Sequence, residues 1–172
     1  MTASRRELWL LAIGSAVLFG LRLGARDLWN PNEPIYGEAV REMIERGTWL
    51  VPYVNGVAFA EKPILYYWLA LASSKLLGGV SELSLRVPLF VAAIATVLGT
   101  YVLTRAYVGR ARAIASAVAC GTLFGVFWNA RFVQMDILVT AATLWVVIAV
   151  TRVVDHGGAR LPGYLLAGAI AG

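Results

Sequence analysis

Two pairs of polar residues that could do chemistry lie in one hydrophilic stretch, residues 28–63, between two apolar stretches. They are Asn32 with Glu33, and Glu61 with Lys62. A carboxylate can accept a proton or bind a cation, and an ammonium group can bind an anion such as a phosphate. Because the flanking segments are apolar enough for lipid, this polar stretch indicates a catalytic or binding surface.

Each pair also has a structural interpretation. Asn32 is well placed to cap a helix that has Pro34 in its first turn, where the helix dipole favours the Glu33 carboxylate. Glu61 and Lys62 precede a proline and can form a surface ion pair. The functional alternative is that Lys62 binds an anion while Glu61 binds a metal ion or accepts a hydrogen bond. The residues alone leave both interpretations open.

Asp136 is the sharpest single candidate, because it interrupts an otherwise apolar stretch. Acidic groups at a membrane edge are rare and usually functional. A structural salt bridge with Arg131 is the competing account. The single histidine, His156, is interpreted as a solvated loop residue. The single cysteine, Cys120, lies in an apolar run, which excludes disulfides and thiolate metal sites within the chain.

The composition indicates a polytopic helical membrane protein of the all-α class. Of the 172 residues, 59% are hydrophobic and 15% charged, and the mean hydropathy is +0.71. Soluble domains contain about a quarter charged residues. The net charge of +5 is therefore interpreted as a topology signal. Since no basic run with interleaved aromatics is present, a nucleic-acid partner is not expected. Phosphate-binding glycine loops and nucleophile elbows are also absent.

Six apolar segments follow one another, and the basic residues decide which of them span the membrane. If all six did, Arg105, Arg110 and Arg112 would lie outside, against the positive-inside rule. The segment 64–78 is short and begins with two tyrosines and a tryptophan, so we interpret it as a helix at the bilayer surface. The expected spans are then 8–23, 87–104, 111–129, 137–154 and a partial one, 161–172. Ending inside an apolar run, the chain resembles the N-terminal part of something longer.

This topology places the N-terminus in the cytoplasm and puts the polar stretch and Asp136 on the same, non-cytoplasmic face. Within the polar stretch, the periodicity of residues 35–46 predicts an amphipathic helix that ends at Gly47. Asn55-Gly56 predicts a turn in the loop that returns to the membrane. The segment 32–78 is therefore expected to be a set of juxtamembrane elements on the outer face.

The sequence resembles a known family in this region. The carrying motifs are Leu28-Trp29-Asn30-Pro31-Asn32-Glu33-Pro34-Ile35-Tyr36-Gly37-Glu38, Gly47-Thr48-Trp49-Leu50-Val51-Pro52, Phe59-Ala60-Glu61-Lys62-Pro63, Glu82-Leu83-Ser84-Leu85-Arg86-Val87-Pro88 and the turn from Arg131 to Asp136. They are similar to those of the GT-C membrane glycosyltransferases, closest to the aminoarabinose–lipid A transferases and their protein O-mannosyltransferase-like bacterial relatives. The resemblance covers about residues 20 to 140.

The resemblance implies an inverting sugar transfer at the outer face of the bacterial inner membrane. The donor would be a polyprenyl-phosphate-linked monosaccharide, and the acceptor a lipid, a glycan or a protein. Glu61 would take the family's metal-site position, with a divalent metal of unknown identity. Lys62 would lie near the lipid phosphate, and Asp136 would match an important aspartate of the second outer loop. We add Tyr36 and Arg131, in the matched motifs, as substrate-binding candidates.

One position departs from the family pattern. Members usually have Asp-Glu where this chain has Asn32-Glu33, and that aspartate is thought to act on the acceptor. An asparagine cannot take a proton. The catalytic candidates are therefore Glu33, Asp136 and the altered Asn32. The open alternatives are that Glu33 or Asp136 does the work, that the acceptor differs, or that the protein binds a lipid-linked sugar or partner without efficient transfer. A transporter is a third class, but its charges would gather in mid-span.

Overall fold

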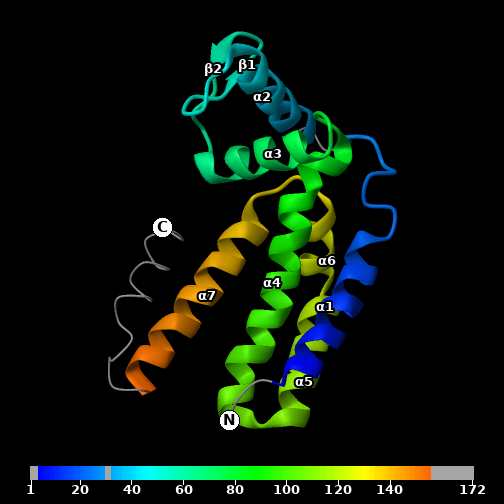
Figure 1. Cartoon of the computed structure of the whole chain (residues 1–172), viewed down its shortest axis with the longest axis vertical. Coiled ribbons are helices and arrows are strands. Elements are labelled where there is room, and N and C mark those ends of the chain that lie inside the picture. Colours follow the sequence, from blue (N-terminus) through cyan, green and yellow to red (C-terminus); the bar gives the residue numbers. More distant parts are fainter. Residues whose placement is uncertain (1–3, 30–31, 156–172) are drawn as a thin grey trace.

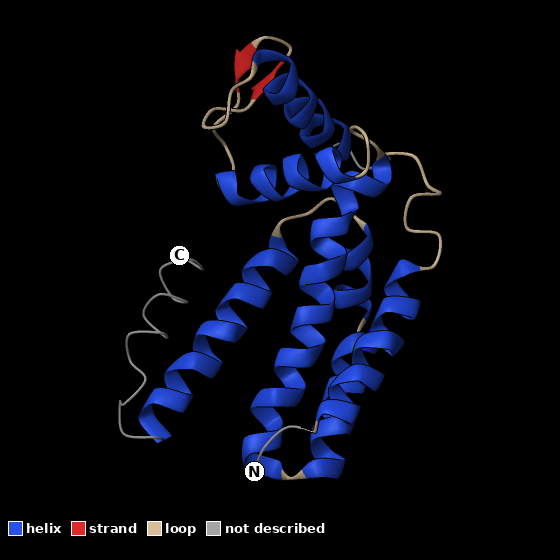
Figure 2. Cartoon of the chain, in the orientation of Figure 1, coloured by secondary structure: helices blue, strands red, loops and turns tan. Residues whose placement is uncertain are grey.

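The computed structural model describes residues 4–29 and 32–155, and it is mainly helical. Helices α1 (Arg5–Gly20), α4 (Glu82–Val108), α5 (Arg110–Thr122), α6 (Phe124–Arg131) and α7 (Asp136–Asp155) form a bundle along the long axis (Figure 1). A smaller group, which we call the cap, lies across one end. It comprises α2 (Asn32–Arg46), β1 (Tyr53–Val54), β2 (Val57–Ala58) and α3 (Ile64–Leu76). The two short strands of the cap are the departure from an all-α fold (Figure 2).

Two helices of the described residues, α4 and α7, are long and apolar enough to cross a membrane. The pair α5 and α6 passes the same test as one segment, bent by 56° between Thr122 and Phe124. The expected span over 111–129 falls within this bent pair. Helix α1 has 16 residues and begins three residues before the expected span 8–23. The expected partial span 161–172 and His156 lie outside the described residues.

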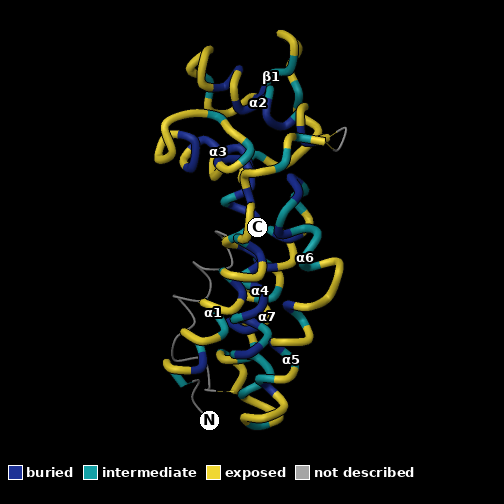
Figure 3. Tube along the Cα trace, turned by 90° about the vertical axis from the view of Figure 1, so that its right-hand side faces the viewer, coloured by how far each residue is buried: buried dark blue, intermediate teal, exposed yellow. Residues whose placement is uncertain are grey.

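The surface of the bundle is apolar. Every helix of the bundle exposes large hydrophobic side chains. Examples are Leu10, Val91, Val118, Phe124 and Val139. Figure 3 shows the burial concentrated along α4, while the outer helices carry much of the exposure. Soluble proteins rarely expose large contiguous apolar patches. With helices that satisfy their own backbone hydrogen bonds, such a surface belongs in a membrane.

The functional candidates lie at one end of the bundle. The described residues between α1 and α4, which include the cap, and the turn of residues 132–135 lie at the cap end, whereas the start of α1 lies at the opposite end (Figure 1). The sharing of one end by the polar stretch and Asp136, predicted from charge asymmetry, is therefore confirmed. Helix α3 runs across the end of the bundle rather than along it, in agreement with a surface helix over 64–78.

Helix α3 docks on α4 where a proline interrupts the hydrogen bonds of α4. Pro88 lies inside α4 and has no N–H to donate to the Ser84 carbonyl one turn earlier. The Ser73 hydroxyl on α3 donates to that carbonyl at 2.6 Å. The Ser74 hydroxyl lies 3.0 Å from the Ser84 hydroxyl. Ser73 and Ser74 thus attach α3 to the bundle.

A return loop completes the cap. Asn55 and Gly56 both have positive φ, at 52° and 79°, and join β1 to β2 as the sequence predicted. The Glu42 carboxylate on α2 accepts a hydrogen bond from the Gly56 N–H at 3.0 Å and pairs with Arg46 at 2.9 Å. Helix α2 ends at Arg46, and Gly47 follows with φ of 66°. The hairpin is therefore held against α2.

Candidate active site

Glu33 is the centre of a buried hydrogen-bond network at the junction of cap and bundle. It lies in the first turn of α2, and its side chain is fully buried. Its Oε1 accepts a hydrogen bond from the Val133 N–H at 2.7 Å. Its Oε2 accepts from the Arg26 guanidinium at 2.9 Å and from the Trp29 N–H at 3.2 Å. The carboxylate thus joins the loop after α1, the cap and the turn before α7.

Arg86 on α4 is the functional partner that the sequence analysis missed. Its side chain is fully buried, with Nη2 at 3.3 Å from the Glu33 carboxylate. The guanidinium also donates to the backbone carbonyls of Leu23 at 3.0 Å, Arg26 at 2.6 Å and Asp27 at 3.1 Å. A lone arginine near the start of an apolar helix was the available signal, since such a charge requires partners.

These contacts determine the ionisation of Glu33. Burial alone would raise the pKa of its carboxyl, but the hydrogen bond from Val133 and the guanidinium groups of Arg86 and Arg26 outweigh burial and lower that pKa. The carboxylate is therefore ionised near neutral pH. Because several donors already occupy its oxygens, it has little capacity left to take a proton from a substrate. The geometry favours an anchoring role for Glu33.

Three tyrosines from α2 and α3 pack together beside this network. The ring centroids of Tyr36, Tyr66 and Tyr67 lie 5.6 to 6.4 Å apart, in edge-to-face arrangements. All three side chains are buried, with Tyr36 the most accessible at 6% exposure. The predicted substrate-binding residue Tyr36 is therefore part of a packed aromatic cluster.

Tyr36 lies at the same end of the molecule as two other sequence-predicted candidates, Glu61 and Asp136. Burial raises the pKa of the Tyr36 hydroxyl, and the negative charges of Glu61 and Asp136 raise it further. Tyr36 lies on α2, Glu61 lies just before α3, and Asp136 begins α7, so all three belong to segments at the cap end of the bundle (Figure 1).

The remaining candidates lie at the edge of this group. Glu61 and Lys62 are exposed, and neither forms an ion pair with a residue of the described ranges 4–29 and 32–155. Asn32 is exposed and is the first residue of α2. Because an exposed charged group without an ion-pair partner remains available to a substrate, Lys62 could bind one.

Arg131 does not pair with Asp136. One nitrogen of its guanidinium donates to the backbone carbonyls of Phe19 and Leu21, each at 2.8 Å, and the group lies 5.3 Å from the Phe127 ring centroid. The alternative of a structural salt bridge is therefore wrong. Arg131 instead fastens the end of α1 to α6.

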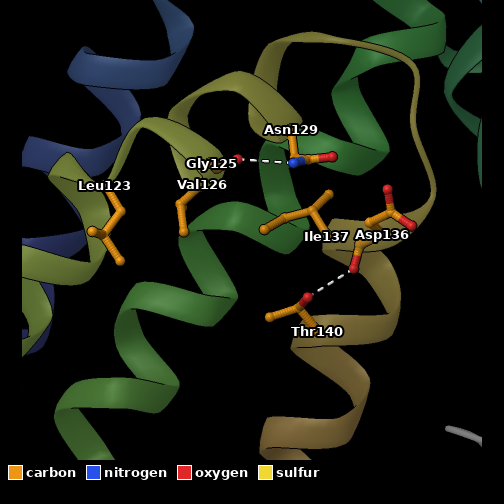
Figure 4. Close-up of a pocket in the computed structure, with 7 residues that line it drawn as sticks. All are labelled: Leu123, Gly125, Val126, Asn129, Asp136, Ile137 and Thr140. Carbon is orange, nitrogen blue, oxygen red and sulfur yellow. Dashed lines mark hydrogen bonds between the residues drawn. The ribbon is translucent and has the colours of Figure 1, made fainter.

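Asp136 begins α7 and is exposed at the rim of a cavity of about 300 Å³. The cavity lies between α6 and the first turn of α7, and Figure 4 shows Asn129 and Asp136 on its two sides. Asn129 donates from its amide nitrogen to the Gly125 carbonyl at 2.9 Å. Among the described residues, the side chain of Asp136 has no ion-pair partner. Its carboxylate is therefore the candidate that is available to act as an acid or a base.

No metal site is complete within the part of the chain that the structure describes. Three or more histidine, cysteine, aspartate or glutamate residues do not gather there in a way that could hold a metal ion. The assignment of Glu61 as a metal ligand therefore stays a prediction. Its oxygen chemistry suits a hard cation that takes its other ligands from phosphate and water.

An apolar helical bundle with a polar cap at one end defines a polytopic membrane protein. The sequence model of the dolichyl-phosphate-mannose-protein mannosyltransferase family matches residues 61–172, and the chain belongs to this family. The resemblance to GT-C glycosyltransferases inferred from the motifs of the cap is thereby confirmed.

Curated relatives agree with this assignment. The chain is 31% identical over 173 residues to the undecaprenyl phosphate-alpha-4-amino-4-deoxy-L-arabinose arabinosyl transferase of Aeromonas hydrophila, covering 95% of this chain and 30% of the relative. It is 43% identical over 70 residues to the protein of the same name from Shewanella sediminis, covering 41% of this chain and 13% of that one. The chain therefore spans about a third or less of these relatives.

A solved structure shows the same fold. The crystal structure of ArnT from Cupriavidus metallidurans in the apo state superimposes with a TM-score of 0.75 and 22% identity. The match covers 83% of this chain and 26% of that chain. The arrangement of cap and bundle is thus that of a GT-C-type transmembrane domain.

Proposed function

We propose that the protein transfers a monosaccharide from a polyprenyl-phosphate-linked donor to a lipid, glycan or protein acceptor. The observation that carries the proposal is the position of Tyr36, Glu61 and Asp136, in three separate segments, at the cap end of an apolar bundle. The relatives' names, which specify an undecaprenyl-phosphate-linked aminosugar, support this donor class. A lipid-linked donor would place its chain in the bilayer and its phosphate and sugar at this end.

The proposed step is an inverting substitution at the sugar. An acceptor oxygen attacks the anomeric carbon, the bond from that carbon to the phosphate oxygen breaks, and the lipid phosphate leaves. Asp136 takes the acceptor's proton, because its carboxylate is open whereas that of Glu33 is occupied. Lys62 binds the phosphate and stabilises the negative charge that develops on it. Tyr36 lines the site.

Glu33, Arg86 and Arg131 act on the substrate only through the positions of other residues. Glu33 and Arg86 hold the start of α2 against the turn that leads to Asp136. Arg131 holds the end of α6, which leads into that turn, to the end of α1. We had assigned Glu33 a catalytic role and Arg131 a substrate-binding role, and we now propose positioning roles for both.

A divalent metal would be held by Glu61 with the phosphate of the donor. Such an ion would add positive charge beside the leaving group when bound. With Glu61 as the single protein ligand, the site would suit an ion that keeps several waters, as Mg²⁺ does.

The proposed location is the outer face of the bacterial inner membrane, with the N-terminus in the cytoplasm. The basic residues Arg105, Arg110 and Arg112 lie at or near the α4–α5 junction, at the end of the bundle opposite the cap. Under the positive-inside rule this end faces the cytoplasm, so the cap faces outward.

Asn32 favours a second candidate function, in which the protein binds a lipid-linked sugar without transferring it. The neutral amide stands where family members usually have an acid, and it starts α2 on the exposed side of the cap. Restoring the acid with Asn32→Asp separates the two. A gain of transfer would identify the asparagine as an impairment, whereas no gain in an active protein would show that the site has been rearranged.

The test of the proposed function is a transfer assay with radiolabelled undecaprenyl-phosphate sugars and the natural-length protein in membranes. Lys62→Ala should lower kcat/KM by about 10- to 100-fold, because a charge-assisted hydrogen bond contributes about 1.5–3 kcal/mol. The matched control is Arg41→Ala, which removes an exposed positive charge of the cap that pairs with Glu38 at 3.3 Å. Equal activities of the two variants would exclude the phosphate role of Lys62.

A further inference from the structure

Two adjacent tyrosines on α3 have the same burial and opposite hydrogen-bonding states. The Tyr66 side chain is 1% exposed and that of Tyr67 is 0% exposed. The Tyr66 hydroxyl donates to the Leu85 carbonyl on α4 at 3.2 Å. The Tyr67 hydroxyl is enclosed and has no hydrogen-bond partner among residues 4–29 and 32–155. Buried tyrosine hydroxyls usually have such a partner, so the second one requires an explanation.

The surroundings of the Tyr67 hydroxyl belong to the proposed transfer site. Its ring lies against Tyr36, with centroids 6.4 Å apart. Burial raises its pKa, and the neighbouring Tyr36 and Glu61 raise it further. The group is therefore a protonated donor at neutral pH. A hydrogen-bond donor without a protein partner can donate to an oxygen that arrives with the substrate.

We propose that the Tyr67 hydroxyl is a substrate-binding group that donates a hydrogen bond to an oxygen of the lipid-linked sugar donor. This inference rests on the proposed function, because it takes that donor as the occupant of the site. The acceptor is an oxygen either of the phosphate or of the sugar. Since the hydroxyl is enclosed, the groups that cover it must move when the donor binds.

The proposal makes a contrast between neighbours that a purely structural role would not make. Tyr67→Phe removes a hydroxyl that has no protein partner, so the variant should unfold at the same temperature as the wild type or higher. Tyr66→Phe removes a buried hydrogen bond between α3 and α4, so it should lower the unfolding temperature. For substrate affinity we expect the opposite: Tyr67→Phe should weaken binding of the donor, and Tyr66→Phe should not.

The experiment measures dissociation constants of the natural-length protein in nanodiscs by native mass spectrometry. The probes are undecaprenyl phosphate and the same lipid carrying 4-amino-4-deoxy-L-arabinose, the sugar in the relatives' names. Tyr67→Phe should weaken binding about 5- to 30-fold, in the range of one hydrogen bond to a polar or charged acceptor. Weakening for both probes assigns the oxygen to the phosphate, and weakening for the sugar-bearing probe alone assigns it to the sugar.

Two results would overturn the inference while the proposed function stands. One is wild-type binding of both probes by Tyr67→Phe. The other is a loss of thermal stability in this variant as large as that of Tyr66→Phe, which would show that the hydroxyl has a protein partner. If the wild-type protein itself binds neither probe, the proposed donor class is wrong, and the inference fails with it.

Discussion

At the scale of single residues, Glu33 and Asp136 differ in how much of each carboxylate is already in use. Glu33 is buried and accepts hydrogen bonds from two backbone N–H groups and two guanidinium groups. Asp136 is exposed and its carboxylate has no ion pair within the described residues. We therefore assign anchoring to the first and proton transfer to the second.

Glu33→Gln should destabilise the fold by about 3–5 kcal/mol, because it leaves the buried Arg86 guanidinium without a counter-charge. Thermal unfolding in detergent measures the change. The control is Glu38→Gln on the same helix, whose carboxylate is partly exposed and pairs with the exposed Arg41. That variant should lose less than about 1 kcal/mol. A Glu33 variant that is fully stable yet inactive would instead support a catalytic role.

The lowered pKa of Glu33 also predicts how stability depends on pH. In the unfolded chain the carboxyl has a pKa of about 4.3 and binds its proton at a higher pH than in the folded protein. The contribution to stability is therefore fully present above about pH 4.3 and is lost as the pH falls through the lower pKa of the folded state. Unfolding followed between pH 3 and 6 should show this loss in the wild type and less of it in Glu33→Gln. Identical pH profiles would contradict the anchoring role.

The sequence identified most of the candidate residues but not their pairing. Asp136, Glu61 and Lys62 stood out because charges are rare beside apolar spans. Arg86 did not, because its partner Glu33 lies 53 positions away in the chain and only the folded structure brings them together. The role of Glu33 changed for the same reason, since burial and tertiary hydrogen bonds have no local sequence signal.

At the scale of elements, the attachment of the cap depends on how α3 compensates for the proline in α4. Ser73 donates to the carbonyl of Ser84 that Pro88 leaves without its usual helical donor. The hydroxyl of Ser73 also contacts the carbonyls of Leu69 and Ala70 in its own helix. The bond from Ser73 to the Ser84 carbonyl is one of several hydrogen bonds between α3 and α4, and it can be tested by itself.

Ser73→Ala should cost about 1–2 kcal/mol of unfolding free energy, because it leaves a buried carbonyl without a donor. In a Pro88→Ala background the new backbone N–H can serve that carbonyl, so the same serine substitution should cost less. A double-mutant cycle measured by thermal unfolding should give a coupling of about 1 kcal/mol. Strictly additive effects would show that the serine does not compensate for the proline.

Element types were predictable where periodicity or turn chemistry is local. The helix over 35–46 with its stop at Gly47, the turn at Asn55-Gly56 and the spans at α4 and α7 follow from such patterns. The break at Leu123 does not, because the segment has no proline and its hydrophobicity is continuous. Extended backbone angles at this one residue, φ −61° and ψ 130°, separate α5 from α6.

At the scale of the whole molecule, the cap and the bundle differ in the chemistry of their surfaces. The bundle presents an apolar surface to lipid, and the cap holds the charged and aromatic candidates at one end (Figure 1). A lipid-linked substrate has the same division, with an apolar chain and a charged head. The chain spans about a third or less of the length of its curated relatives.

The most direct test is transfer of radiolabelled sugar from undecaprenyl phosphate by the natural-length protein, compared between Asp136→Asn and Asp27→Asn. Both variants neutralise an exposed carboxylate at the cap end, but of the two only Asp136 lines the cavity between α6 and α7. We predict transfer by the wild type, a loss of about 10²- to 10⁴-fold in kcat for Asp136→Asn, and near wild-type rates for Asp27→Asn. Wild-type rates in both variants would contradict the assignment of proton transfer to Asp136, and an inactive wild-type protein would contradict the proposed transfer itself.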